Sequence, residues 1–95
     1  MKQAKVKRSP EELLRYHHDR EGNLGKYGLE WGSSGHMYSA GFYDGVSFID
    51  NETAIRGEFG SKAAASYAKG REKGNEAAHE YGRKTGKQLS NLKLR

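Results

Sequence analysis

Four histidines and the carboxylates near them are the residues of this chain with the clearest potential for chemistry. Glu76 and His79 stand three positions apart, the spacing at which di-iron helical bundles place two metal ligands on one helix face. Such a centre needs two copies of the pair, and the sequence holds one. His17 and His18 are adjacent, so on a helix their side chains point about 100° apart and chelate one ion poorly. We therefore predict no metal site.

Motifs for catalysis or cofactor binding do not accompany these residues. The chain has no cysteine, which excludes a disulfide framework and a thiolate zinc site. The glycine-rich segments GLEWGSSG and GEFGSK lack the spacing of a Walker loop, and no nucleophile elbow is present. We predict that the protein is not an enzyme and that it binds no cofactor.

The net charge of +5 is spread unevenly along the chain. Residues 1–32 carry seven basic and five acidic side chains, residues 33–60 carry one and four, and residues 61–95 carry nine and three. The two basic ends could contact phosphate or an acidic protein surface, or they could serve solubility alone. The candidate phosphate contacts are Lys2, Lys5, Lys7, Arg8, Lys69, Arg71, Lys73, Arg83, Lys84 and Lys87.

The length of 95 residues predicts a single small domain, residues 1–95, with a flexible basic arm at 1–8 and a flexible tail at 90–95. Large apolar side chains are few, so we expect a marginal monomer, a homodimer or a protein completed by a partner. The start of the chain is basic and leads into a charged segment, unlike a secretory signal, and no stretch is long enough to span a bilayer. These features predict a cytoplasmic protein without membrane contact.

The segment SPEELLRYHHDR carries the clearest helix signal. Ser9 is a candidate N-cap, Pro10 occupies the favoured first position, and Glu12 completes a capping box. We predict a helix from about Pro10 to Arg20. The following residues, 21–34, contain four glycines, and we expect an ordered loop there instead of a short strand.

Two later segments, YSAGFYDG (Tyr38 to Gly45) and YAKGREKG (Tyr67 to Gly74), share one frame: Tyr, two residues, Gly, three residues, Gly. The first copy admits two interpretations. Asp44 and Gly45 could form a hairpin turn, or the copy could be a helix with its glycines on one face.

The second copy belongs to a predicted long basic helix that begins with Ser61 as its cap and ends near Leu89, with a candidate break between Gly82 and Gly86. Small residues and tyrosines recur along it at helical spacing, a pattern that permits close approach of another helix. The expected helix-packing face comprises Gly41, Gly45, Tyr67, Gly70, Gly74, Ala78 and Tyr81. If both copies are helical, their glycine faces pack together in a helical hairpin or a swapped dimer.

The predicted fold class is therefore mostly α: a short capped N-terminal helix, a glycine- and aromatic-rich middle, and a long basic C-terminal helix. The alternative is α+β, with a small antiparallel sheet formed by residues 26–50 and covered by the long helix.

Two classes of function remain. The first is a small non-enzymatic protein-interaction factor, for example a modulator encoded by a phage or mobile element that binds a host protein or complex. Its expected contact surface is aromatic: Tyr27, Trp31, Tyr38, Phe42, Tyr43 and Phe48. The alternative is a small basic protein that binds nucleic acid or the ribosome. We rank the first class ahead, because the aromatic residues concentrate where the net charge is negative.

Overall fold

The computed structural model describes residues 8–94, and within them the chain forms four α-helices and no strand. The elements are α1 (Pro10–Gly22), α2 (Ser34–Val46), α3 (Glu52–Phe59) and α4 (Ser61–Thr85), with two short 3-10 helices, η1 (Leu24–Tyr27) and η2 (Leu89–Asn91). The mostly helical fold is confirmed. The α+β alternative is wrong, because residues 26–50 contain no strand and most of them lie in α2.

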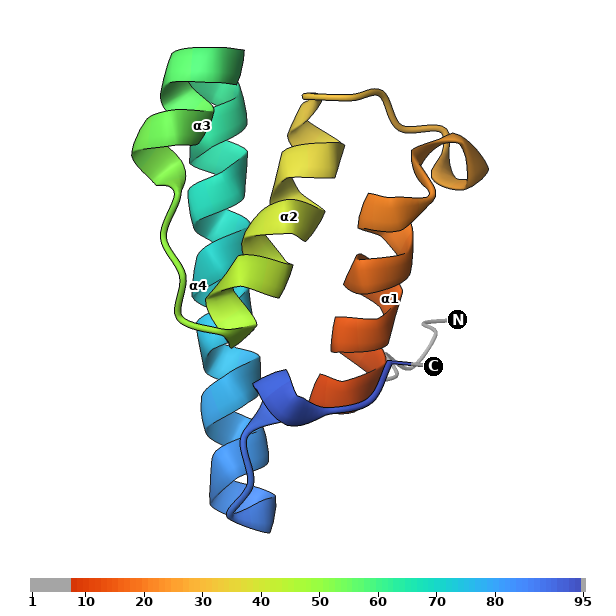
Figure 1. Cartoon of the computed structure of the whole chain (residues 1–95), viewed down its shortest axis with the longest axis vertical. Coiled ribbons are helices and arrows are strands. Elements are labelled where there is room, and N and C mark those ends of the chain that lie inside the picture. The colour runs from red at the N-terminus through yellow and green to blue at the C-terminus, as the bar shows by residue number, and fades with distance from the viewer. Residues whose placement is uncertain (1–7, 95) are drawn as a thin grey trace, which may run out of the picture.

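The helices are arranged around α2, which lies between α1 on one side and α3 with α4 on the other (Figure 1). α2 and α4 run in the same direction, and α3 returns the chain from the end of one to the start of the other (Figure 1). After α4 the chain reverses, and η2 passes below α2 towards the start of α1 (Figure 1). The end of α4, η2 and the start of α1 therefore meet at one end of the molecule.

The first helix begins as its sequence predicts. The Ser9 hydroxyl accepts a hydrogen bond from the Glu12 N–H at 3.2 Å, and the Glu12 carboxylate accepts one from the Ser9 N–H at 2.9 Å. The helix continues to Gly22, two residues beyond the expected end. The loop expected after it is present, as η1 and a series of turns.

The hairpin alternative at Asp44 and Gly45 is wrong, since both residues lie inside α2. The Ser33 hydroxyl caps this helix by accepting a hydrogen bond from the His36 N–H at 3.2 Å. Two interior glycines disfavour a helix by about 0.5–1 kcal/mol each relative to alanine. The packing of α2 on α4 overrides that local preference.

The glycines of α2 allow the backbone of α4 to approach without a side chain between them. A Cβ atom at Gly41 would lie 2.1 Å from the carbonyl oxygen of Tyr67, and one at Gly45 would lie 2.2 Å from the carbonyl oxygen of Arg71. Both distances are far below van der Waals contact, and the obstacles are backbone atoms that cannot rotate away. Only glycine fits at these two positions.

The glycines of α4 make the reciprocal contact. A Cβ atom at Gly70 would lie 2.0 Å from the carbonyl oxygen of Tyr38, and one at Gly74 would lie 2.2 Å from that of Phe42. In each helix the contacted carbonyls belong to the residues three positions before the glycines. Each copy of the repeated frame thus forms one side of the crossing. The carbonyl of its tyrosine contacts the first glycine of the other copy: Tyr38 contacts Gly70, and Tyr67 contacts Gly41.

This crossing is not the helical hairpin expected from the sequence. Successive contacts lie further along both helices in the same order, so α2 and α4 are parallel and cross within one chain. A parallel pair needs a return connection, and α3 provides it. No strong sequence signal marks α3, because it is eight residues long and contains Gly57. Ile55 and Phe59 hold α3 in place by packing against the buried side chains of α2 and α4.

The long helix differs from its prediction at both ends. Ser61 is the first helical residue and not the cap, a position that Gly60 occupies without a side-chain hydrogen bond. The helix ends at Thr85, followed by Gly86 in the left-handed region at φ 73°, within the predicted break. Leu89 reaches the core from η2 and not from the helix. Residues 90–94, expected as a flexible tail, place Leu92 and Leu94 against that core.

Phe42 is a core residue with 1% of its surface exposed, packed with Leu14, Val46 and Leu89. Its expected place in an aromatic contact surface is therefore wrong. The helical period explains the error: Phe42 lies four residues before Val46, on the face of α2 that α1 and α4 cover.

We predict that Gly70→Ala destabilises the protein strongly, because the new Cβ atom would collide with the Tyr38 carbonyl and force α2 from α4. The expected loss is at least about 1–3 kcal/mol, measured by urea unfolding. Gly57→Ala is the matched control: apart from its chain neighbours and the backbone of α3 itself, no atom of the described residues lies within 4 Å of the added Cβ. This variant should gain about 0.5–1 kcal/mol. Equal effects at the two positions would contradict the crossing.

Buried His17 links α1 to α2. Its Nδ1 atom lies 2.9 Å from the Ser39 hydroxyl, and its ring packs on Phe42 with the ring centroids 4.5 Å apart. Burial lowers the pKa of His17 from 6.5 to about 4, and the positive charges of Arg20 and Arg8 add to the effect. The imidazole is therefore neutral in the folded protein at neutral pH.

Stability should fall as the pH drops from about 6.5 towards 4. In this window the unfolded chain protonates His17 and the folded chain does not, so acid favours unfolding by up to about 1.4 kcal/mol per pH unit. Urea unfolding at several pH values measures the slope, which His17→Asn should reduce. His79→Gln, at an exposed histidine, is the control and should leave the slope unchanged. A flat profile in the wild type would contradict the buried neutral imidazole.

Candidate functional site

The exposed aromatic side chains do not form one surface. Trp31, 72% exposed, lies beside His36 and Phe59 at the end of the molecule where α2 begins. Tyr43 lies beside His18, and Phe48 lies beside His79. The three residues thus occupy three separate places.

Two further members of the expected aromatic surface are engaged within the fold. The Tyr27 hydroxyl donates a hydrogen bond to the Asp19 carboxylate, and the Tyr38 ring lies 5.5 Å from the buried His17. Both tyrosines are half-buried. Tyr27 and Tyr38 therefore make contacts within the fold and do not belong to one continuous aromatic surface.

Several of the predicted phosphate contacts are paired with carboxylates. Arg71 lies 3.6 Å from Asp50, Lys73 lies 3.7 Å from Glu76, and Lys84 lies 2.9 Å from Glu80. Lys69 is exposed on α4, and the Arg8 guanidinium lies 4.6 Å from the centroid of the Tyr16 ring. Lys2, Lys5 and Lys7 lie outside the described residues.

Four exposed cations gather where α4, η2 and α1 meet, and we call this group the basic end: Arg15, Arg83, Lys87 and Lys93. Within residues 8–94 no ion pair involves any of them. Arg83 and Lys87 were predicted as phosphate contacts, whereas Arg15 and Lys93 were missed. Leu92 and Leu94, on either side of Lys93, could have predicted its position, because apolar residues in a C-terminal segment indicate that the segment packs on the core.

Two adjoining clefts open at the basic end. One, of about 550 Å³, is lined by Arg15, Lys87 and Lys93 together with Tyr81, and the other, of about 490 Å³, by Arg83 and Lys87 together with Phe48 and His79. We call the second the Phe48 cleft. The two share Lys87 and Gln88, and no Asp or Glu of the described chain lines either of them.

The chain reversal after α4 places Lys87 between the clefts. Gly86 takes the left-handed conformation that ends the helix, and its N–H donates to the Gly82 carbonyl at 2.8 Å. The Thr85 hydroxyl donates to the Tyr81 carbonyl at 2.8 Å and accepts from the Lys87 N–H at 3.0 Å. Burial of Leu89 then anchors the returning chain.

Phe48 occupies an unusual backbone position. It follows α2 at φ 59°, and its N–H donates to the Gly45 carbonyl at 3.0 Å, while the Ile49 N–H donates to the Asp44 carbonyl at 2.9 Å. This pair of hydrogen bonds is a Schellman motif, in which the residue in the left-handed conformation is usually glycine. A side chain there costs about 1–2 kcal/mol. Phe48 is nevertheless 60% exposed, and its ring centroid lies 5.5 Å from that of His79.

The segment that carries Phe48 is tied to α4 on both sides. Before it, the Asn75 side-chain amide donates to the Gly45 carbonyl at 2.6 Å. After it, the Asn51 N–H donates at 2.9 Å to the hydroxyl of buried Tyr67, which donates in turn to Asp44 at 2.5 Å. Burial raises the pKa of Tyr67, and the hydrogen bond to Asp44 adds to the increase. Phe48 is thus held by a rigid support.

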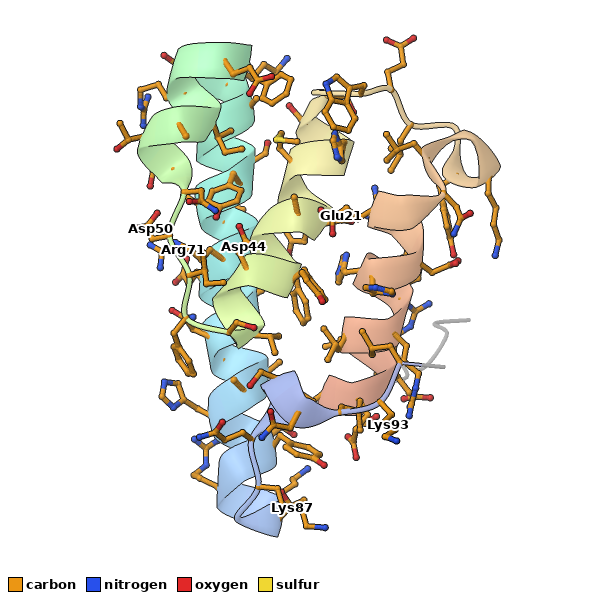
Figure 2. All side chains as sticks on the ribbon, viewed as in Figure 1. Glu21, Asp44, Asp50, Arg71, Lys87 and Lys93 are labelled. Carbon is orange, nitrogen blue, oxygen red and sulfur yellow. The ribbon has the colours of Figure 1, made fainter. Side chains whose placement is uncertain are left out.

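The carboxylates labelled in Figure 2, those of Glu21, Asp44 and Asp50, lie in the upper half of the molecule, where Arg71 lies beside Asp50. Lys87 and Lys93 lie at the opposite end (Figure 2). Burial raises the pKa of Glu21, and the neighbouring Asp44 carboxylate raises it further. An anionic ligand would therefore be favoured at the basic end and disfavoured at the carboxylates.

Residues 8–94 contain no group of three or more His, Asp or Glu side chains placed to hold a metal ion. In the same part of the chain, no helix has the length and apolar character required to cross a bilayer. Comparison with protein-family models, curated proteins and solved structures finds no match to this chain.

We predict that Phe48→Gly is more stable than Phe48→Ala by about 1 kcal/mol, because both remove the ring but only glycine relieves the left-handed backbone. Thermal unfolding measures the difference. At neighbouring Ser47, where φ is −97°, the same comparison should favour alanine or show no preference. Equal stability of the two variants at position 48 would contradict the left-handed conformation.

Proposed function

We propose that the protein is a small non-enzymatic nucleic-acid-binding protein whose basic end contacts the phosphate backbone. The observation that carries the proposal is the pair of adjoining clefts lined by four cations, which within residues 8–94 have no ion pair and no carboxylate beside them in the lining. Cations of this kind bind phosphates through release of condensed counterions. The cations on the middle of α4 are less suited, because Arg71 and Lys73 already lie beside carboxylates.

A second candidate is the protein-interaction factor, for example a phage- or mobile-element-encoded modulator of a host complex. Exposed Trp31 favours it, since tryptophan is enriched among the residues that dominate protein interfaces. We rank it behind nucleic-acid binding because the other exposed aromatic residues lie elsewhere on the molecule. Cytoplasmic location and a homodimer stay predictions for either candidate.

Fluorescence anisotropy with labelled oligonucleotides tests the proposal. Lys87→Glu should weaken binding at least about tenfold, because Lys87 borders both clefts. With four phosphate contacts, log K should fall with log salt at a slope of about −3.

The matched control is Lys62→Glu, which changes the net charge equally near the opposite end of α4 and should change affinity less than about twofold. Trp31→Ala should leave oligonucleotide binding intact. No binding at about 50 mM salt, or equal losses for Lys87→Glu and Lys62→Glu, would contradict the proposal.

A further inference from the structure

We infer that the Phe48 cleft receives an unpaired base, so that the basic end prefers single-stranded nucleic acid to duplex. This inference rests on the proposed function and adds to it the form of nucleic acid that is bound. It starts from Phe48, whose conformation and exposure the fold itself does not explain.

The fold would be served better by glycine at position 48. The left-handed φ of 59° is costly for an aromatic residue, and 60% of its surface remains exposed. Residues in such conformations persist where the surrounding structure enforces them, and they concentrate at functional sites. Here the hydrogen bonds from Asn75 and through Tyr67 enforce the conformation.

The cleft beside Phe48 is suited to a flat aromatic ring. Its buried lining residues are apolar, namely Val46, Ala78 and Leu89, and its exposed ones include the rings of Phe48 and His79. Its volume of about 490 Å³ falls within the range of ordinary ligand pockets. A base that enters can therefore contact an aromatic face and an apolar floor together.

The charges of the cleft complement the backbone that accompanies such a base. Arg83 and Lys87 line the same cleft, so phosphates on either side of the base have cations within the site. Stacking of a base on an aromatic side chain contributes about 1–3 kcal/mol and tolerates any base. In a duplex the faces of the bases are already stacked on each other, so only the phosphate contacts remain.

An acidic peptide with an aromatic residue is the competing occupant of this cleft. It could also place carboxylates on Arg83 and Lys87, but it lacks the regular charge that would engage Arg15 and Lys93 in the adjoining cleft. Cations that line two clefts sharing Lys87 favour a polyanion.

The test measures the affinity of the full chain for a single-stranded DNA, the RNA of the same sequence and the corresponding DNA duplex. Phe48→Leu keeps an apolar side chain but removes the aromatic face, and it should weaken single-strand binding about 5- to 100-fold while duplex binding stays the same. Phe48→Trp, which keeps an aromatic face, should retain the preference. The DNA and RNA single strands show which type of nucleic acid supplies the base. A weaker affinity of Phe48→Leu for either strand supports the inference.

Phe48→Gly distinguishes loss of the ring from loss of the fold. It should unfold at a higher temperature than Phe48→Ala and still bind single strands as weakly as Phe48→Leu. An unchanged single-strand affinity in Phe48→Leu, an equal loss on duplex, or displacement of the oligonucleotide by a glutamate- and tryptophan-containing peptide at equal concentration would overturn the inference.

The two proposals fail in different ways. If Lys87→Glu weakens binding but Phe48→Leu leaves single-strand and duplex affinities unchanged, the inference about Phe48 is wrong and the proposed function stands. If no oligonucleotide binds to the wild type, both are wrong.

Discussion

The carbonyl oxygens of Tyr38 and Tyr67 occupy the space that a Cβ atom would take at Gly70 and Gly41. Because these glycines have no side chain, the backbones of α2 and α4 lie close together as a parallel pair, an approach that small residues permit. The remaining elements follow from it. A parallel pair in one chain requires the return through α3, and the faces left over are covered by α1 and by the C-terminal segment.

The same crossing supports the candidate site. Because the two helices are close, side chains of α4 reach the end of α2 and the segment after it: Asn75 bonds the Gly45 carbonyl, and Tyr67 bonds Asp44 and Asn51. These contacts hold Phe48 in a conformation that its side chain disfavours. The long helix continues past the crossing, and its Arg83 lines the same cleft as Phe48. The packing of α2 on α4 thus also positions the residues of the proposed binding site.

Local signals in the sequence predicted part of this structure. The capping box at Ser9 was readable because its partners are three residues apart, and the glycine frame was readable because it recurs. By contrast, α3 depends on contacts of Ile55 and Phe59 with distant residues, which its short sequence does not reveal. The basic end joins cations from the first helix and the last segment of the chain, so their proximity follows only from the fold.

Nuclear Overhauser effects between the backbones of α2 and α4 test the crossing most directly. A Cβ position at Gly41 lies 3.0 Å from the Arg71 nitrogen, and one at Gly70 lies 3.0 Å from the Phe42 nitrogen. The α protons of each glycine should therefore give strong cross-peaks to the amide proton of its partner residue. Cross-peaks confined to each glycine's own helix, in a protein that is otherwise folded and helical, would contradict the close parallel pair.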